Sequence, residues 1–443
     1  MASGVGKTTV AAGLMAALRA RGCKVAAAKV GPDFIDPGYH AVATGRPGRN
    51  LDSWMCGEPA MAPLAGRAGA GADLLVVEGV MGLFDGASGG GPDASTASIA
   101  RLLDAPVLLV VDASAMSRSV AALVHGYTSF EPDLRVAGVV LNRVGSAGHL
   151  DLLREALAPL AVPVLGALGR DDALSWRDRH LGLVPVAEQP ATVAASLERL
   201  AAVTARSVDL DAVVALARTA PTRPVEDPAL PERAGRARVA VAGGPAFSFV
   251  YRDNLEALEA AGAELLALDP LSDPVLPPGT EALYVGGGFP EVYAAALASN
   301  TSLLADVRAR VGDGLVTWAE CGGLLWLARS LDGAALAAVL PADAEMTGRL
   351  TLGYRTATTR RDTPLGAPGT VLRGHEFHYS TLDPPGDALQ LQGRRSSALG
   401  GFATPRLLAS YLHLHLGGDP APARRFVATA SAARTRPARH LLR

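Results

Sequence analysis

Two groups of residues, far apart in the chain, have the types and the spacing that chemistry requires. The first is a glycine-rich run that opens at Ser3 and ends in Lys7-Thr8-Thr9. The backbone N–H groups and the lysine of such a run bind the phosphates of a nucleotide. The second is Cys321, which precedes two glycines and has His413 far downstream. A thiolate with a histidine base suits the release of ammonia from a carboxamide. Together they predict an enzyme that uses ATP and glutamine to make an amide.

Each residue of the predicted phosphate loop has a distinct task. Gly4 and Gly6 let the backbone approach a polyphosphate closely. Lys7 is expected to reach the β and γ oxygens, and the Thr8 hydroxyl is placed to hold magnesium. The predicted nucleotide-binding residues of the loop are Gly4, Val5, Gly6, Lys7, Thr8 and Thr9.

Magnesium prefers oxygen ligands, so carboxylates are expected beside Thr8. Glu78 ends the apolar run 74–77 and would stand at the carboxyl edge of a strand, where ligands bind in open α/β sheets. Asp33 and Asp36 follow the apolar run 25–30 in a loop. The predicted magnesium ligands are Thr8, Asp33 and Glu78. The alternatives are a surface acid for Glu78 and turn capping for either aspartate.

The second group predicts a glutaminase site. Cys321 follows the apolar run 315–318 and precedes two glycines, which favours a tight elbow that exposes the sulfur near a helix N-terminus. His413 would be its base. Gly287 and Gly288, after the run 282–285, are the predicted oxyanion hole. The alternatives are a buried structural cysteine, an ordinary glycine loop, and a structural or metal-binding histidine.

Apolar runs separated by helix-length stretches predict two α/β domains. A helix is expected from Thr8 to Arg21, followed by strands near 25–30, 74–77, 107–111 and 136–141. Runs at 239–242, 282–285 and 315–318 predict a second sheet. The expected boundaries are 1–217 for the first domain, 218–237 for a proline-rich linker and 238–418 for the second domain. The basic segment 419–443 is expected to be a disordered tail, since it carries six arginines from Arg424 onward and no acid there.

A phosphate loop normally follows a buried strand, and here only Met1 and Ala2 precede Ser3. We therefore expect this strand to be missing and the start to lie too far downstream. On this expectation the chain as written is poorly stable or binds nucleotide weakly, because the loop lacks the edge that aims its N–H groups. The full loop pattern also asks for glycine at the position of Met1.

Composition favours a soluble enzyme with small-molecule substrates. The chain has 443 residues, which is more than one core usually serves, and its hydrophobic fraction is 49%. No apolar stretch reaches the roughly 18 residues of a membrane span. The net charge of −2 provides no basic field for nucleic acid or anionic lipid. Three scattered cysteines and the lack of a signal peptide fit a reducing cytoplasm.

Several segments resemble cobyrinic acid a,c-diamide synthase. They are KVGPDFIDPGYH from Lys29, NLDSWM from Asn50, VEGVMGLFDG from Val77, AFSFVYRDNLE from Ala246, GGGFPE from Gly286, AECGGLLWL from Ala319, RGHEFHYS from Arg373 and SYLHLH from Ser410. The resemblance covers nearly the whole chain. It implies a dethiobiotin synthetase-like phosphate-loop domain, followed by a class I glutamine amidotransferase-like domain.

The resemblance also implies a reaction. ATP would phosphorylate a carboxylate with the help of magnesium, and glutamine-derived ammonia would convert the acyl phosphate to an amide. The substrate would be cobyrinic acid or metal-free hydrogenobyrinic acid, amidated at its a and c acetate side chains in cobalamin biosynthesis, and a homodimer is left open. Asp33, Asp36, Glu78 and Asp85 fall on the family's acidic active-site positions. Asn142 resembles its base-contacting asparagine, with a turn residue as the alternative.

Two other functions stay open at this point. Cobyric acid synthase amidates other side chains of the same ring, although the segment from Lys29 to His40 argues against it by family pattern. Partition ATPases share the loop, but they carry a second lysine where Ala2 stands. One departure concerns the glutaminase: many enzymes of this fold have a glutamate two residues after the histidine, and His415 occupies that place. The sequence assigns no role to His375, Glu376 or His378.

Overall fold

The computed structural model describes residues 2–87, 94–170, 185–222 and 230–434, together with the backbone of 178–179 and 182–183. Within these, the chain divides into two compact units, residues 1–228 and 229–443. The division falls inside the proline-rich segment that was predicted as the linker. The last helix of the first unit ends at Ala217, and the first strand of the second unit begins at Ala237.

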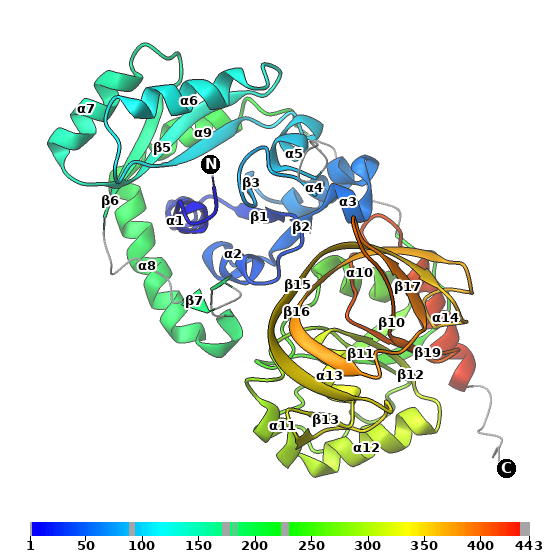
Figure 1. Ribbon diagram of the computed structural model, residues 1–443. Coiled ribbons are helices and arrows are strands. Elements are labelled where there is room, and N and C mark those ends of the chain that lie inside the picture. The colour runs from blue at the N-terminus through cyan, green and yellow to red at the C-terminus, as the bar shows by residue number, and fades with distance from the viewer. Residues whose placement is uncertain are drawn as a thin grey trace. The chain divides into compact units, whose positions relative to one another are not determined.

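The first unit alternates helices and strands (Figure 1). Its helices are α1 (Lys7–Ala20), α2 (Asp36–Thr44), α3 (Ser53–Cys56), α4 (Met61–Gly69), α5 (Thr96–Leu102), α6 (Ser119–Ser129), α7 (Ala147–Leu157), α8 (Pro190–Ser207) and α9 (Leu210–Ala217). Its strands are β1 (Val25–Val30), β2 (Arg49–Leu51), β3 (Leu74–Glu78), β4 (Val107–Asp112), β5 (Val136–Val144) and β6 (Val164–Gly169), with a short pair β7 (Asp178–Arg179) and β8 (Gly182–Leu183). All four predicted strands and the predicted first helix are therefore present.

Strands β1 to β6 of the first unit form two parallel sheets, with strand orders β2-β1-β3 and β4-β5-β6, whereas β7 and β8 pair antiparallel. Every residue of β1 is buried, which explains its uninterrupted apolar sequence apart from Lys29. One core lies around α1, α2 and α8, and a second lies between α6, α7 and the strands β4 and β5. The α/β class expected from the spacing of the runs is confirmed.

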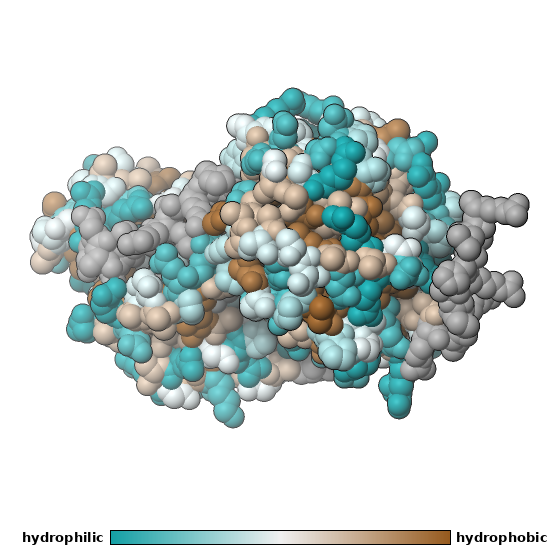
Figure 2. Space-filling view, turned by 90° about the horizontal axis from the view of Figure 1, so that it is seen from below, coloured by the Kyte–Doolittle hydropathy of each residue, from teal (hydrophilic) through white to brown (hydrophobic). Residues whose placement is uncertain are grey.

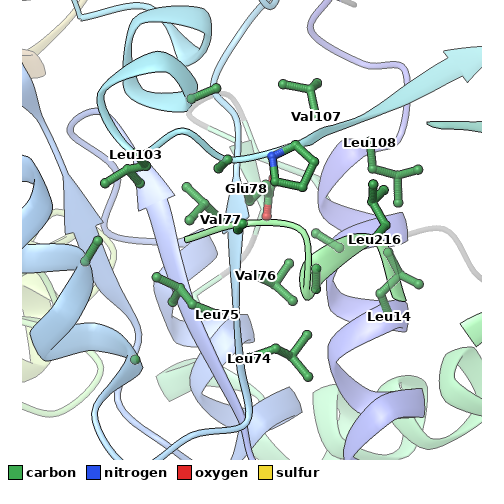
Figure 3. Close-up of a pocket in the computed structure, with 18 of the residues that line it drawn as sticks. Leu14, Leu74, Leu75, Val76, Val77, Glu78, Leu103, Val107, Leu108 and Leu216 are labelled. Carbon is green, nitrogen blue, oxygen red and sulfur yellow. The ribbon is translucent and has the colours of Figure 1, made fainter. Parts of the chain in front are cut away.

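A cavity of about 950 Å³ lies between β3 and β4. Apolar side chains line it from both strands and from α1, among them Leu75, Leu108 and Leu14, as the close-up in Figure 3 shows. At one end it reaches Lys7 and Glu78. The cavity is thus lined by β3 at the edge of one sheet and by β4 at the edge of the other.

The described residues of the second unit form two sheets. The six-stranded sheet has the order β10-β9-β11-β12-β20-β19 and is parallel except at β19. Its strands are β9 (Ala237–Ala242), β10 (Ala263–Leu268), β11 (Ala282–Val285), β12 (Val316–Glu320), β19 (Phe402–Thr404) and β20 (Leu407–Ser410). Its flanking helices are α10 (Arg252–Ala261), α11 (Ala294–Ser299), α12 (Thr301–Gly312), α13 (Gly322–Leu327) and α14 (Ala421–Arg434). The three predicted strands of the second domain are all present.

Alternate residues of the central strands supply cores on the two faces of this sheet. Leu283 and Val285 pack on one face with α12 and α13, whereas Tyr284 and Trp318 pack on the other with α10 and α14. The basic segment after residue 419 therefore differs from the expected disordered tail. Phe426 of α14 is fully buried, because an apolar side of the helix completes this core. Residues 435–443 lie outside the described part of the chain.

The second sheet of this unit is mixed and was not predicted. It contains β13 (Ser330–Leu331), β14 (Ala334–Ala335), β15 (Asp343–Thr359), β16 (Val371–Asp383), β17 (Leu389–Gln392), β18 (Ser397–Gly400) and β21 (His413–Leu414). The two long curved strands in Figure 1 are β15 and β16, which pair antiparallel. β16 also pairs with β21, so that His375 lies opposite His413.

Among the helices of the described residues, none is long and apolar enough to cross a membrane. The large apolar side chains that are exposed, such as Phe130, Val275 and Leu352, are spread over both units. Figure 2 shows hydrophobic residues on one face as spots among hydrophilic ones.

Candidate active site

The phosphate loop has the backbone conformation that its glycines permit. Gly4 and Gly6 have φ values of +77° and +91°, a region that side-chain-bearing residues rarely adopt. α1 begins directly after Gly6, so its N-terminal N–H groups face the loop, as in phosphate-binding sites. Lys7 donates from Nζ to the Ala2 carbonyl at 2.7 Å. Burial, and then Lys29, lower the pKa of Lys7.

Asn142 lies against this loop. It is a residue of β5, and its Nδ2 donates to the carbonyl of Val5 at 2.9 Å. A Cβ on Gly6 would come within 2.2 Å of the same Nδ2. In this conformation the Asn142 amide supports the phosphate loop, and its contact with a nucleotide base stays a prediction.

The carboxylates gather beside Thr8. The Thr8 hydroxyl donates to Glu78 Oε1 at 2.6 Å and lies 3.2 Å from Asp36 Oδ2. Lys29, from β1, donates to the same two oxygens at 2.6 Å for Asp36 and 2.8 Å for Glu78. Residues from α1, α2, β1 and β3 thus meet at one edge of the sheet. Lys29 was missed as a site residue, although a lysine within an otherwise apolar strand was a visible signal.

Burial and pairing set the charges of this cluster. Burial raises the pKa of Glu78, but Lys29 and His40 more than offset it, so the pKa lies well below its usual range. His40 was also missed; it is fully buried, and its Nε2 lies 2.6 Å from Glu78 Oε2. Burial, with the nearby Asp33 and Glu78, raises the pKa of Asp36 to about 7. Lys29 keeps its proton, because Glu78 and Asp36 raise its pKa more than burial lowers it.

Two predicted acids, Asp33 and Asp85, accept backbone N–H groups of their own turns. Asp33 Oδ1 accepts the backbone N–H groups of Ile35 at 2.8 Å and Asp36 at 2.9 Å, so Asp33 caps its own turn and Asp36 takes the place beside Thr8. Turn capping, the alternative for this loop, is what Asp33 does. Asp85 is exposed and accepts the N–H of Gly82 at 2.7 Å. It still raises the pKa of Lys7, so it lies near the phosphate loop.

Cys321 occupies a tight elbow between a strand and a helix. β12 ends at Glu320, α13 begins at Gly322, and Cys321 between them has φ 45° and ψ −99°. A positive φ is uncommon for a residue with a side chain and is typical of nucleophile elbows. The Cys321 N–H donates to the Ser410 carbonyl at 2.8 Å, which ties the elbow to β20.

His413 stands beside this cysteine. The Cys321 side chain is near enough to raise the pKa of His413, and Nδ1 of His413 lies 3.7 Å from Oε2 of Glu320. Burial lowers the pKa of His413, but Cys321 and Glu320 raise it, with a net value of about 9. The ring of His375 stacks on that of His413, with centroids 4.9 Å apart. Burial, with His413 and His415, holds the pKa of His375 well below 6.5.

The loop that contains Gly287 and Gly288 lies next to the Cys321 elbow, but these two glycines differ in role. The Gly287 N–H donates to the Phe249 carbonyl at 3.0 Å, so it does not point toward an oxyanion as predicted. Gly287 instead makes room for His413, since a Cβ there would lie 2.4 Å from Cε1 of the ring. The nitrogen of Gly288 lies 3.0 Å from the place of a Cβ on Gly322, so both glycines border the nucleophile.

His415 and His378, among the described residues of the second unit, have partners that the sequence did not show. His415 Nε2 lies 3.7 Å from Asp253 Oδ2. His378 stacks on Tyr411 with centroids 3.7 Å apart. Glu376 forms a buried ion pair with Arg355 at 2.8 Å. No group of three or more His, Cys, Asp or Glu that could hold a metal ion occurs in the described ranges.

Comparisons with known proteins agree with this architecture. Residues 1–184 match the CobQ/CobB/MinD/ParA nucleotide binding domain, and residues 238–421 match the CobB/CobQ-like glutamine amidotransferase domain. A hydrogenobyrinate a,c-diamide synthase from Streptomyces coelicolor is 48% identical, with 96% of this chain and 95% of that protein covered. One from Thermobifida fusca is 49% identical, with 98% and 96% covered. A cobyrinate a,c-diamide synthase from Synechococcus sp. is 43% identical, with 94% of each chain covered. The chain therefore belongs to the family of hydrogenobyrinate and cobyrinate a,c-diamide synthases.

Proposed function

We propose that this chain uses ATP and glutamine to amidate the a and c acetate carboxylates of a corrinoid. One observation carries the proposal. A phosphate loop with adjoining carboxylates and a buried Cys321–His413 pair occur in one chain, and this chain matches a,c-diamide synthases along nearly its whole length. The relatives with 48% and 49% identity are named for hydrogenobyrinate, which makes the metal-free ring the first substrate to test.

The second unit would release ammonia from glutamine. The Cys321 sulfur attacks the carboxamide carbon, and the C–N bond breaks as His413 gives its proton to the leaving nitrogen. Water then attacks the thioester, His413 takes a proton from it, and glutamate leaves. We assign the oxyanion hole to the N–H groups of Gly288 and Gly322, in place of Gly287, because the Gly287 N–H is bonded to Phe249.

The first unit would activate the carboxylate. The loop from Gly4 to Thr9 binds the phosphates of ATP, and Lys7 contacts the group that is transferred. The γ-phosphoryl group passes from ATP to a substrate carboxylate oxygen, so that ADP leaves and an acyl phosphate forms. Ammonia then attacks the acyl carbon, and inorganic phosphate leaves. Lys29, held by Asp36 and Glu78, provides a fixed positive charge at the same edge of the sheet.

The residues at this edge fit a magnesium ion. Thr8, Asp36 and Glu78 offer three oxygen ligands, and the Thr8 hydroxyl lies within hydrogen-bonding distance of both carboxylates. Magnesium commonly uses one or two carboxylates and completes its shell with waters and nucleotide phosphates. We therefore propose Asp36 in place of Asp33 in the ligand set. When bound, the ion would offset the negative charge of the transferred group.

The test is the release of ADP and glutamate with ATP, magnesium and glutamine, with hydrogenobyrinic acid, cobyrinic acid or neither. We expect release that depends on a corrin acid, and a product whose mass shows two new amides. ATP hydrolysis that needs no corrin acid would contradict the proposal and favour a partition-type ATPase. Amides on side chains other than a and c would favour activity of the cobyric acid synthase kind.

A further inference from the structure

The glutaminase site needs a group that orients its histidine. In Cys–His and Ser–His sites a third group, often an acid, holds the imidazole and stabilises its protonated form. The usual place, two residues after the histidine, is held here by His415. That residue lies 3.7 Å from Asp253, so it has a carboxylate partner of its own.

A carboxylate reaches His413 from another direction. Glu320 is the last residue of β12, directly before the nucleophile, and it is 1% exposed. Its Oε2 lies 3.7 Å from Nδ1 of His413. The Leu414 N–H donates to Oε1 at 3.0 Å, and the Tyr284 hydroxyl donates to Oε2 at 3.2 Å. These two donors fix the carboxylate, and one of them comes from the residue next to His413.

We propose that Glu320 is the positioning residue of the glutaminase site. Its carboxylate holds the Nδ1 side of the His413 ring, stabilises the imidazolium and leaves the other ring nitrogen for Cys321. The inference rests on the proposed glutamine hydrolysis and deepens it. The acid thus comes from the residue before the nucleophile rather than from the strand of the histidine.

Charge and burial make such a partner necessary. His413 carries a proton between the thiol and the leaving nitrogen, and a buried charge without a partner is costly. The titratable side chains around it are Cys321, Glu320, His375, Glu376, His378 and His415. His375 stays neutral, and Glu376 is paired with Arg355. Glu320 is therefore the acid whose charge is directed at His413.

The test is the pH dependence of glutamine hydrolysis in Glu320→Gln, which keeps the size of the side chain and removes its charge. We expect kcat to fall about 10²-fold or more, with KM for glutamine within about threefold, by analogy with triad acids. Both limbs of the profile should move inward. Without the carboxylate the imidazolium loses its proton at lower pH. The thiol then has no cation beside it and loses its own proton at higher pH.

A second measurement follows the thiol without any turnover. Alkylation of Cys321 by iodoacetamide, located by peptide mass, should reach half its maximal rate at a higher pH in Glu320→Gln. Glu320→Asp keeps the charge, so both limbs of its pH profile should lie close to those of the native chain. Asp253→Asn is the matched control, since it removes a buried carboxylate beside His415 and should move neither limb.

The outcomes separate this inference from the proposed function. Ammonia-supported amidation should survive in Glu320→Gln, which shows that the first unit is intact, and the retained KM for glutamine shows that the second unit is folded. A loss of rate with both limbs and the alkylation profile unmoved would mean that Glu320 only packs, and would overturn the inference. If the native chain hydrolyses no glutamine, the proposed function fails, while the alkylation comparison still decides the role of Glu320.

Discussion

Gly287 shows how one missing side chain shapes the glutaminase site. A Cβ at this position would lie 2.4 Å from Cε1 of His413, too close for the buried ring to remain in place. We expect Gly287→Ala to displace the ring from Cys321 and to lower the rate of glutamine hydrolysis about 10²-fold, because a shift of about 1 Å has such effects. Amidation supported by ammonia should persist.

The measurement is glutamate release alongside ammonia-supported ADP release. Gly312→Ala serves as the control, since a Cβ there meets no atom within 4 Å. Unchanged glutamate release in Gly287→Ala would contradict this prediction and show that glutamine hydrolysis tolerates a displaced His413 ring.

The buried cluster at Lys29 makes a prediction about pH. Lys29→Met leaves Asp36 and Glu78 buried without their cation, and removing one partner of a buried pair commonly costs about 3–5 kcal/mol. The folded-state pKa values of both carboxyls should then lie above their unfolded values near 4. Stability should therefore fall as pH rises from about 5 to 8, through the pKa of about 7 that Asp36 already has.

Urea unfolding at pH 5 and pH 8 tests this expectation. The loss of stability in Lys29→Met should be larger at pH 8, where the two carboxyls are charged. Lys24→Met, which changes an exposed lysine of the same unit, should show little loss at either pH. An equal loss of stability at both pH values would mean that Lys29 acts through packing alone.

Residue types predicted which side chains gather at the two sites better than they predicted contacts. Cys321, His413, Lys7, Thr8 and Glu78 were all chosen from short motifs, and the structure brings Lys7, Thr8 and Glu78 together in the first unit and Cys321 and His413 together in the second. Their chemical roles stay predictions. The exchange between Asp33 and Asp36 was not predictable, since turn geometry decides which of two nearby aspartates caps the loop. Glu320 was overlooked because its partner His413 is 93 positions away and is brought near only by the pairing of strands.

At the scale of elements, buried parallel strands were the most predictable. β1, β3, β4 and β11 are short apolar runs, because both faces of a parallel sheet are covered. β15 and β16 were missed, since many of their residues are partly or fully exposed and polar residues interrupt the apolar pattern. The arginines of α14 suggested a solvated tail, and the apolar side of this helix, which is buried, was therefore not recognised in the sequence.

α14 makes a prediction that separates a core helix from a tail. Phe426 is fully buried and its ring lies 6.1 Å from that of Trp318. We expect Phe426→Ala to destabilise the second unit by about 3–5 kcal/mol, because a large buried side chain leaves a cavity. Tryptophan fluorescence during urea unfolding would measure the loss.

Arg424→Ala is the matched control on the exposed side of the same helix. Its ion pair with Glu232 spans 3.9 Å at the surface, so its effect should stay within about 0.5 kcal/mol. A Phe426→Ala variant as stable as the native chain would favour the disordered tail that the sequence suggested.

At the scale of the whole molecule, the two reactions belong to separate compact units. Each unit has its own sheets and its own cores. Lys7 and its acidic neighbours are in the first unit, and Cys321 with His413 and Glu320 is in the second. Ammonia, a small neutral molecule, links the two reactions, and it can also be supplied from solution.

This separation predicts two opposite patterns of loss. Cys321→Ala should lose glutamine-dependent amidation and keep ammonia-dependent amidation, because the first unit is unchanged. Lys7→Ala should lose ADP and amide formation with either nitrogen source, yet keep glutamine hydrolysis. The assay measures ADP, glutamate and amide with each nitrogen source for both variants and the native chain. If Lys7→Ala also abolished glutamine hydrolysis, nucleotide binding in the first unit would be required to activate Cys321, and the two units would act as one coupled catalyst.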